Sequence, residues 1–289
     1  MIAHDRRTAD SRLARLFVAP VILIVGATAL VPIASTVWAA LHQRDLRLPW
    51  LGQPFVGLAN FVEAAGDRRF LDAVLHTVMF AAMTVPIELA LGLAVALVMH
   101  RVQRGRAIVR AAALLPWAIP TVVAALVWRL VFDNTTTMFG FDWFSNSRAA
   151  WIPIAAADVW KTTPFVAVLL LAGLQTIDQE IYESARLDGA SATRQLFTIT
   201  VPLLAPAIVV AAAFRTLDAL RLFDLPYVMT GGGPGTATEP LSLYAFVALM
   251  ERLRFGYGSA LSISVFALTF LVALAFVRSL GHASRVEAS

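Results

Sequence analysis

Six long apolar runs constrain the fold of this 289-residue chain more than any other feature of its sequence. They cover residues 16–41, 73–100, 107–132, 151–176, 203–224 and 259–279. As a helix, each is long enough to cross the roughly 30 Å hydrocarbon core of a bilayer. Strand-like alternation is missing, and a lone hairpin in lipid would leave backbone groups without hydrogen bonds. We therefore predict an all-α, polytopic membrane protein with six transmembrane helices.

Composition supports membrane insertion and narrows the possible chemistry. The chain is 59% hydrophobic and 15% charged, whereas soluble domains are roughly 45–50% apolar and about 25% charged. It has no cysteine, which excludes disulfides, thiolate metal sites and cysteine nucleophiles. An intramembrane enzyme is an alternative, but no sequence motif supports it. The sequence has no His-Glu-x-x-His pair and no Gly-x-Ser-x-Gly elbow. No basic cluster interleaved with aromatic residues indicates nucleic-acid binding. We predict no catalytic or metal site.

The N-terminal segment has two interpretations. A charged stretch before an apolar run can be a signal peptide, and small residues near Ala34 and Ala39 would permit cleavage. However, the run 16–41 is longer than the roughly 7–15 residues of a signal-peptide core. We interpret it as an uncleaved first span.

Arginine placement predicts the orientation in the membrane. The basic bias is sharpest in the short loop 101–110, which carries four arginines. Both termini are then cytoplasmic, as tails 1–15 and 281–289 of a six-helix transmembrane domain spanning 16–280. The predicted outer segments include the loops 42–72 and 225–258. These contain one or two short amphipathic helices and a turn-rich glycine stretch, or they are plain connecting loops.

The polar segment 177–200 separates the fourth and fifth runs. Thr176 and Gln179 have capping-box spacing, which predicts the start of a helix. Gly189 can end that helix in a left-handed conformation, and Ser191 can cap a second one. The pattern predicts a cytoplasmic helix–turn–helix with an apolar stripe. Such a pair is either a docking site for a partner or an amphipathic loop on the lipid headgroups.

A spacing pattern in this segment carries a family resemblance. Glu183-Ser-Ala185 is followed by Gly189 after three residues and by Ile199-Thr-Val-Pro202 after nine more. This resembles the EAA loop of binding-protein-dependent ABC importer permeases, with Ser184 in place of alanine and Val201 in place of leucine. In that family the loop docks into a cleft of a separate ATPase subunit. The resemblance assigns ATPase coupling to Tyr182, Glu183, Ala185, Arg186, Asp188, Gly189 and Ala190.

Other stretches extend the resemblance over roughly residues 16–280. "VWKTTPFVAVLLLAGLQTI", "FRTLDALRLFDLPYVMTGGGPGTAT" and "FGYGSALSISVF" are typical of the carbohydrate-uptake branch, the maltose/trehalose type. "VALVMHR" and "FRTLDA" are similar to mycobacterial trehalose-importer permeases. The resemblance implies an ATP-driven importer in the bacterial inner (cytoplasmic) membrane, for a disaccharide such as trehalose or for an oligosaccharide. Its implied partners are a second homologous permease, an ABC ATPase dimer and an extracytoplasmic sugar-binding protein.

Energy for transport has to come from outside this chain. A Walker A loop needs Gly-x4-Gly-Lys-Ser/Thr, and the only lysine, Lys161, lacks those glycines. We therefore expect no cofactor on this chain, with ATP and Mg²⁺ held by the partner ATPase. The alternative is an ion-coupled secondary transporter with Glu88 or Asp218 as proton carrier, although no inverted repeat is apparent.

Charged residues inside the predicted spans need partners. Glu88 makes either a helix–helix hydrogen bond or a substrate contact. Lys161 can pair with Asp158 three residues earlier, and it either anchors the span or lines the path. Arg215, Asp218 and Arg221 share one face of the fifth span, and Asp218 can pair with either arginine.

This charged face suits a polar cavity in which sugar hydroxyls donate to a carboxylate and accept from guanidinium groups. Phe165, with Trp128 and Trp160, can offer a flat surface to sugar rings, or these aromatic residues anchor the spans at the interface. The substrate-path candidates are Glu88, Lys161, Phe165, Arg215, Asp218 and Arg221.

Overall fold

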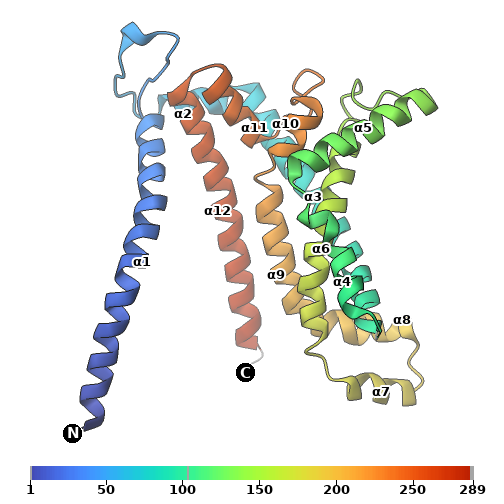
Figure 1. The fold of residues 1–289 in the computed structure, drawn as a ribbon. Coiled ribbons are helices and arrows are strands. Elements are labelled where there is room, and N and C mark those ends of the chain that lie inside the picture. The colour runs from blue at the N-terminus through green and yellow to red at the C-terminus, as the bar shows by residue number, and fades with distance from the viewer. Residues whose placement is uncertain (1, 103, 287–289) are drawn as a thin grey trace. The chain divides into compact units, whose positions relative to one another are not determined.

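The computed structural model describes residues 2–102 and 104–286, which are mostly helical (Figure 1). Within these ranges the only extended pairings are two isolated bridges, His42–Phe55 and Asp45–Arg254. The predicted all-α class is confirmed. In chain order the helices are α1 (Ile2–Ala40), α2 (Ala59–Gly66), α3 (Arg68–Arg101), α4 (Arg106–Ala118), α5 (Thr121–Phe139), α6 (Trp151–Leu174), α7 (Gln179–Leu187), α8 (Ala192–Gln195), α9 (Val201–Ala219), α10 (Asp224–Thr230), α11 (Leu241–Phe246) and α12 (Phe255–Val286).

The predicted spans correspond to long apolar helices. Over the described residues, five helical segments are long and apolar enough to cross a membrane, and a bent pair makes a possible sixth. The five cover Val18–Ala40, Arg68–Arg101, Trp151–Leu174, Ala192–Ala219 and Phe255–Arg278. The predicted tail 1–15 continues α1 over its described part, and 281–286 continue α12, while residues 1 and 287–289 lie outside the described residues.

The third span is broken, so the prediction of one continuous helix over 107–132 is wrong. Helix α4 ends at Ala118, and α5 starts at Thr121 with its axis turned by 86°. The cause is Pro120, because the residue before a proline avoids the helical region. Ile119 accordingly has extended dihedral angles, φ −73° and ψ 131°.

The predicted end of the fifth span is also too late. Helix α9 ends at Ala219, and a turn leads into α10 at Asp224. Leu220 and Leu222 prolong the apolar pattern past this end because they are buried within the turn. At the other end, a π-helical turn (η2, Leu196–Thr200) joins α8 to α9 without a break.

The chain forms two compact units. The first comprises Asp67–Tyr244 and the segment from Ser264 onwards. The second comprises the segment up to Gly66 and Ala245–Ile263. In the first of these, α6 is the central helix, and 67% of an 18-residue apolar stretch within it is buried. It packs against α3, α4, α5 and α9. Two glycines permit close approach: a Cβ on Gly92 would lie 2.4 Å from Val166 Cγ1, and one on Gly173 would lie 2.7 Å from Ala207 Cβ.

Gly92→Ala is expected to destabilise this unit. Its methyl group would overlap Val166 and force α3 and α6 apart, and overpacking of this kind costs about 1–3 kcal/mol. Thermal unfolding in detergent would show a lower midpoint, partly restored by Val166→Ala. Gly26→Ala is the control, because a Cβ there meets nothing within 4 Å. Equal midpoints for Gly92→Ala and Gly26→Ala would contradict the close approach.

The turn-rich stretch 230–240 is firmly held rather than a plain connection. Arg69 forms an ion pair with Glu239 at 2.6 Å, and Glu239 is buried. Trp151 Nε1 donates to Ala237 O at 2.9 Å. Leu241 N donates to Thr77 Oγ1, also at 2.9 Å. The stretch is therefore fixed to the N-terminal half of α3 and the N-terminus of α6.

The other unit holds the loop after α1 in place. Asn60 Nδ2, on α2, donates to Ala40 O at 2.7 Å and to His42 O at 3.1 Å. Arg254 pairs with Glu63 at 2.7 Å. Short 3₁₀ and π turns lie at Pro49–Leu51 (η1) and Val247–Glu251 (η3). The helix predicted within 42–72 is α2.

Candidate functional site

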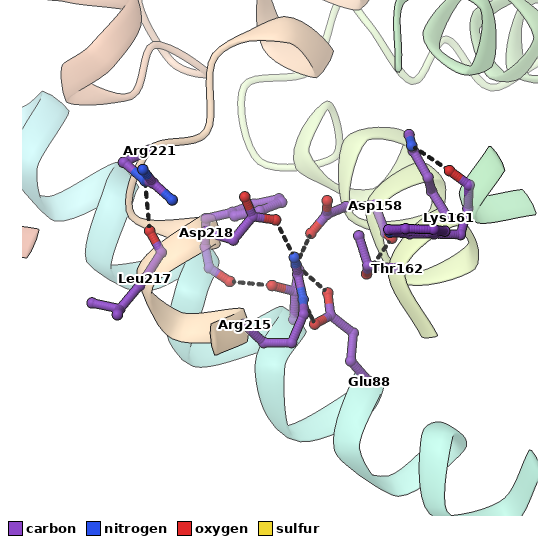
Figure 2. Close-up of polar contacts among 11 residues, drawn as sticks. Glu88, Asp158, Lys161, Thr162, Arg215, Leu217, Asp218 and Arg221 are labelled. Atoms are coloured by element: carbon purple, nitrogen blue, oxygen red, sulfur yellow. Dashed lines mark hydrogen bonds and ion pairs between the residues drawn. The ribbon is translucent and has the colours of Figure 1, made fainter. Parts of the chain in front are cut away.

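Three carboxylate side chains from three helices meet around the guanidinium group of Arg215 on α9 (Figure 2). Arg215 forks onto Glu88 of α3, with Nε–Oε2 at 2.5 Å and Nη2–Oε1 at 2.9 Å. Its Nη2 also reaches Asp158 Oδ2 of α6 at 3.1 Å, and its Nη1 donates to Asp218. We call these four residues the charge cluster. It ties together three helices, α3, α6 and α9.

Burial differs sharply within the charge cluster. Glu88 is 0% exposed and Arg215 is 2% exposed, whereas the Asp218 side chain is 64% exposed. A bidentate fork satisfies both carboxylate oxygens, which is the arrangement a buried charge requires. Of the two roles considered for Glu88, the structure therefore shows the bridge between helices. Asp218 is the member that faces open space.

A cavity of about 280 Å³ adjoins the charge cluster. This volume is close to the lower end of small-molecule sites, roughly 300 Å³. The cavity brings together the two acidic members Asp158 and Asp218 with the cations Lys161 and Arg221. Its walls thus carry both signs of charge. Trp117, Thr121 and Asp224 also line it and were not predicted.

Of the ion pairs predicted within single helices, the Lys161–Asp158 pair is absent, whereas Asp218 pairs with one of its two possible arginines, Arg215. Lys161 Nζ donates to Trp117 O at 3.3 Å rather than to Asp158, which is engaged by Arg215. The other arginine, Arg221, donates its Nε to the Leu217 carbonyl at 3.2 Å. The break after α4 places the Trp117 carbonyl near Lys161, which periodicity within one helix cannot reveal.

The predicted aromatic surface is only partly assembled. Phe165 lies next to Trp117, with ring centroids 6.1 Å apart, and next to Phe214 at 6.2 Å. Trp128 and Trp160 form a separate edge-to-face pair at 5.8 Å. Phe165 therefore contacts the wall of the cavity through Trp117 and is not itself among the residues that line it.

The second candidate region is the pair α7–α8, within the predicted helix–turn–helix 177–200. Asp178, not Thr176, caps α7, and its carboxylate accepts from Glu180 N at 3.0 Å. Thr176 is instead bonded to Gly173 O, so the capping-box prediction is off by two residues. Gly189 has φ 77°, and Ser191 caps α8, both as predicted.

Hydrogen bonds brace the two helices, while large apolar side chains on α7 and on the adjoining η2 are exposed. Tyr182 OH lies 3.1 Å from Thr200 Oγ1, and Gln195 Nε2 donates to Ala190 O at 2.8 Å. Leu187 and Phe197 are exposed by 90% and 66%, respectively. Of the predicted coupling residues, Glu183, Arg186, Asp188 and Gly189 are exposed and Tyr182, Ala185 and Ala190 are half-buried. The exposed Leu187 was not among the predicted coupling residues.

Comparison with known families identifies the chain. Residues 88–283 match the family described as binding-protein-dependent transport system inner membrane component. The chain belongs to this family of ABC importer permeases. It is therefore a multi-pass transport subunit of the inner membrane and not an enzyme.

Two curated relatives extend over nearly the whole chain. The trehalose/maltose transport system permease protein MalF of Thermococcus litoralis is 40% identical over 92% of this chain and 92% of its own length. The trehalose transport system permease protein SugA of Mycobacterium tuberculosis is 38% identical, over 96% of this chain and 92% of its own length. The predicted resemblance is confirmed.

A solved structure has the same fold. A chain of a bacterial ABC transporter involved in the import of the acidic polysaccharide alginate matches with a TM-score of 0.79. The match covers 96% of this chain and 98% of that one, at 19% identity. At that identity the likeness concerns the fold alone.

Proposed function

We propose that this chain is the permease subunit of an ATP-driven importer for a sugar, a disaccharide such as trehalose or an oligosaccharide. The observation that carries the proposal is the exposed, glycine-broken helix pair α7–α8 in a chain of this family. The sugar class is supported by the two relatives named for trehalose and maltose transport.

The exposed surface of α7–α8 supports coupling to a partner that hydrolyses ATP. Leu187 and Phe197 present apolar side chains beside the charged Glu183, Arg186 and Asp188. Such a surface gains free energy when a partner's groove covers it. We assign the partner as an ABC ATPase dimer that holds ATP and Mg²⁺ and lies in the cytoplasm. In this orientation both termini are cytoplasmic.

Transport also needs a second membrane subunit that covers the exposed apolar faces of this one. Much of the apolar surface in α5 and α9 is exposed within this chain, including Leu126, Leu130 and Phe214. We propose that a second, homologous permease encloses the path together with this one, with lipid around both, and that an extracytoplasmic binding protein delivers the sugar. ATP binding would then shift the two permeases between inward-open and outward-open states.

For the substrate path we propose the cavity beside the charge cluster. Asp218 offers an accepting carboxylate, and Lys161 and Arg221 offer donors, all within the lining of one cavity. Sugar hydroxyls donate and accept hydrogen bonds, so they suit walls of mixed charge. The buried pair Glu88–Arg215 would hold Asp218 in position from behind.

Asp218→Asn and Lys161→Met are expected to reduce sugar uptake at limiting concentration. Each removes one charge-assisted hydrogen bond, about 1.5–3 kcal/mol, which corresponds to roughly tenfold or more in apparent affinity. Initial rates over a range of sugar concentrations would measure the change. Asp72→Asn is the control, since Asp72 pairs with Arg68 at the surface. Unchanged rates in both variants would place the path elsewhere.

The sugar itself is best tested in cells that lack this chain. Re-expression of the wild-type chain should restore uptake of labelled trehalose, with unlabelled trehalose and maltose competing. Restored uptake of a different solute, with no sugar competing, would contradict the sugar class.

A further inference from the structure

A second cavity, of about 780 Å³, lies at the C-terminal end of α6. The turn-rich stretch 230–240 contacts the other end of this helix, at Trp151. The ends of α3 and α6, the start of α4 and the pair α7–α8 surround the cavity. Figure 1 shows α4, α7 and α8 close together at the C-terminal end of α6. The polar lining of the cavity includes His100, Arg101, Arg106, Gln179 and Arg186. We call it the basic cavity.

The basic cavity carries positive charge without a matching negative one. Three guanidinium groups line it, and no aspartate or glutamate is among the lining residues. Within the described part of the chain, Arg101, Arg106 and Arg186 make no ion pair. A concave site with cations alone on its walls concentrates anions.

Some of the donors are already held in place. Arg106 Nε donates to Val102 O at 2.8 Å, which fixes that side chain at the start of α4. His100 Nε2 lies 3.3 Å from Gln179 Nε2 and joins the end of α3 to α7. Among the described residues, the two terminal NH₂ groups of Arg106 have no acceptor and are available to another group. Guanidinium groups bind phosphate oxygens in pairs, so a phosphate group fits this donor set.

The rest of the lining is apolar and lies at the ends of spans. Leu97, Leu174 and Leu196 line the same cavity. Leu97 and Leu174 belong to apolar helices long enough to cross the membrane, within four residues of their ends. The cavity therefore combines a polar part and an apolar part at the membrane surface. Basic pockets between span ends of this kind bind the headgroups of anionic lipids.

We propose that the basic cavity binds a phosphate group at the membrane surface, supplied by the headgroup of an anionic phospholipid such as phosphatidylglycerol. The cavity accommodates a glycerophosphate headgroup, and its leucines border the start of the acyl chains. Because Gln179, Tyr182 and Arg186 of α7 share the lining, a bound lipid would contact the base of the α7–α8 pair. This site is independent of which sugar is transported.

Lipid binding to the purified importer complex tests the proposal. Native mass spectrometry would count phosphatidylglycerol and phosphatidylcholine bound to complexes that carry the wild-type chain, Arg101→Gln/Arg106→Gln, or Arg104→Gln. Arg104 is an exposed arginine of the same loop that does not line the cavity. We expect selective binding of phosphatidylglycerol that falls roughly tenfold or more in the double variant and persists in Arg104→Gln.

Three further comparisons sharpen the test. Arg101→Lys/Arg106→Lys retains both charges and should recover part of the binding, which separates charge loss from misfolding. If inorganic phosphate competes with the lipid in wild type but not in the double variant, the phosphate group is confirmed as the recognised part. If inorganic phosphate binds with the same dependence on Arg101 and Arg106 while phosphatidylglycerol does not, the phosphate site is supported and its source is the free ion.

Two results would overturn the proposal. One is equal binding of phosphatidylglycerol in the wild-type, double-variant and Arg104→Gln complexes. The other is loss of the ATPase subunit from the double variant with lipid binding unchanged, which would assign the arginines to an acidic surface of the ATPase.

Discussion

Replacing Arg215 with methionine is expected to cause a large loss of stability in the membrane domain. Glu88 and Asp158 would remain buried without the guanidinium group that binds both of them. Removing one partner of a buried ion pair costs about 3–5 kcal/mol, because the remaining charge is uncompensated. The thermal midpoint of the detergent-solubilised complex, followed by size exclusion after heating, should fall well below that of the wild-type complex.

Two variants make this prediction specific. Arg221→Met removes an exposed arginine that is bonded only to a backbone carbonyl among the described residues, and it should change the midpoint little. Glu88→Gln/Asp158→Asn/Arg215→Met removes the buried charges together and should regain much of the lost stability. If Arg215→Met unfolds no earlier than Arg221→Met, the charge cluster does not hold these helices together.

Gly189→Asp is expected to abolish ATP coupling while the fold survives. Gly189 has φ 77°, and a Cβ there would meet nothing within 4 Å, so the local cost is backbone strain of about 1–2 kcal/mol. The added carboxylate would, however, stand on the exposed turn between α7 and α8 that we assign to ATPase docking. The amount of ATPase that co-purifies with an affinity-tagged chain should fall to background.

Gly140→Asp is a closely matched control for Gly189→Asp. Gly140 also has a positive φ, 71°, with open space around the missing Cβ, but it lies between α5 and α6. The strain and the added charge are therefore the same, and only the location differs. Equal retention of the ATPase in both variants would remove α7–α8 from the coupling interface.

Much of the fold can be predicted from local patterns. The apolar runs predict α1, α3, α6 and α12, since a membrane span needs a continuous apolar stretch of fixed length. Gly189 and Ser191 predict the turn between α7 and α8, because both act through their own backbone conformation. The bend at Pro120 could have been predicted, because the residue before a proline avoids the helical region. It was missed because the apolar run continues across Pro120 without interruption.

The contacts of the site could not be predicted in this way. Glu88 and Arg215 are 127 residues apart, and only the packing of α3 against α9 brings them together. Asp158 was predicted to pair within its own helix, and the structure shows that Arg215 engages it instead. Likewise, the arginines of the loop 101–110 were interpreted as a topology signal. Only the fold shows that Arg101 and Arg106 face a cavity shared with α7.

Measuring which energy source drives uptake is the most direct test of the proposed function. The purified complex would be reconstituted in vesicles with binding protein and labelled sugar on one side and ATP with Mg²⁺ on the other, without an ion gradient. We predict sugar accumulation that requires ATP on the side of α7–α8 and that is lost with Gly189→Asp but retained with Gly140→Asp. Accumulation driven by an imposed proton gradient in the absence of ATP would contradict an ATP-driven importer and would favour Glu88 or Asp218 as a proton carrier.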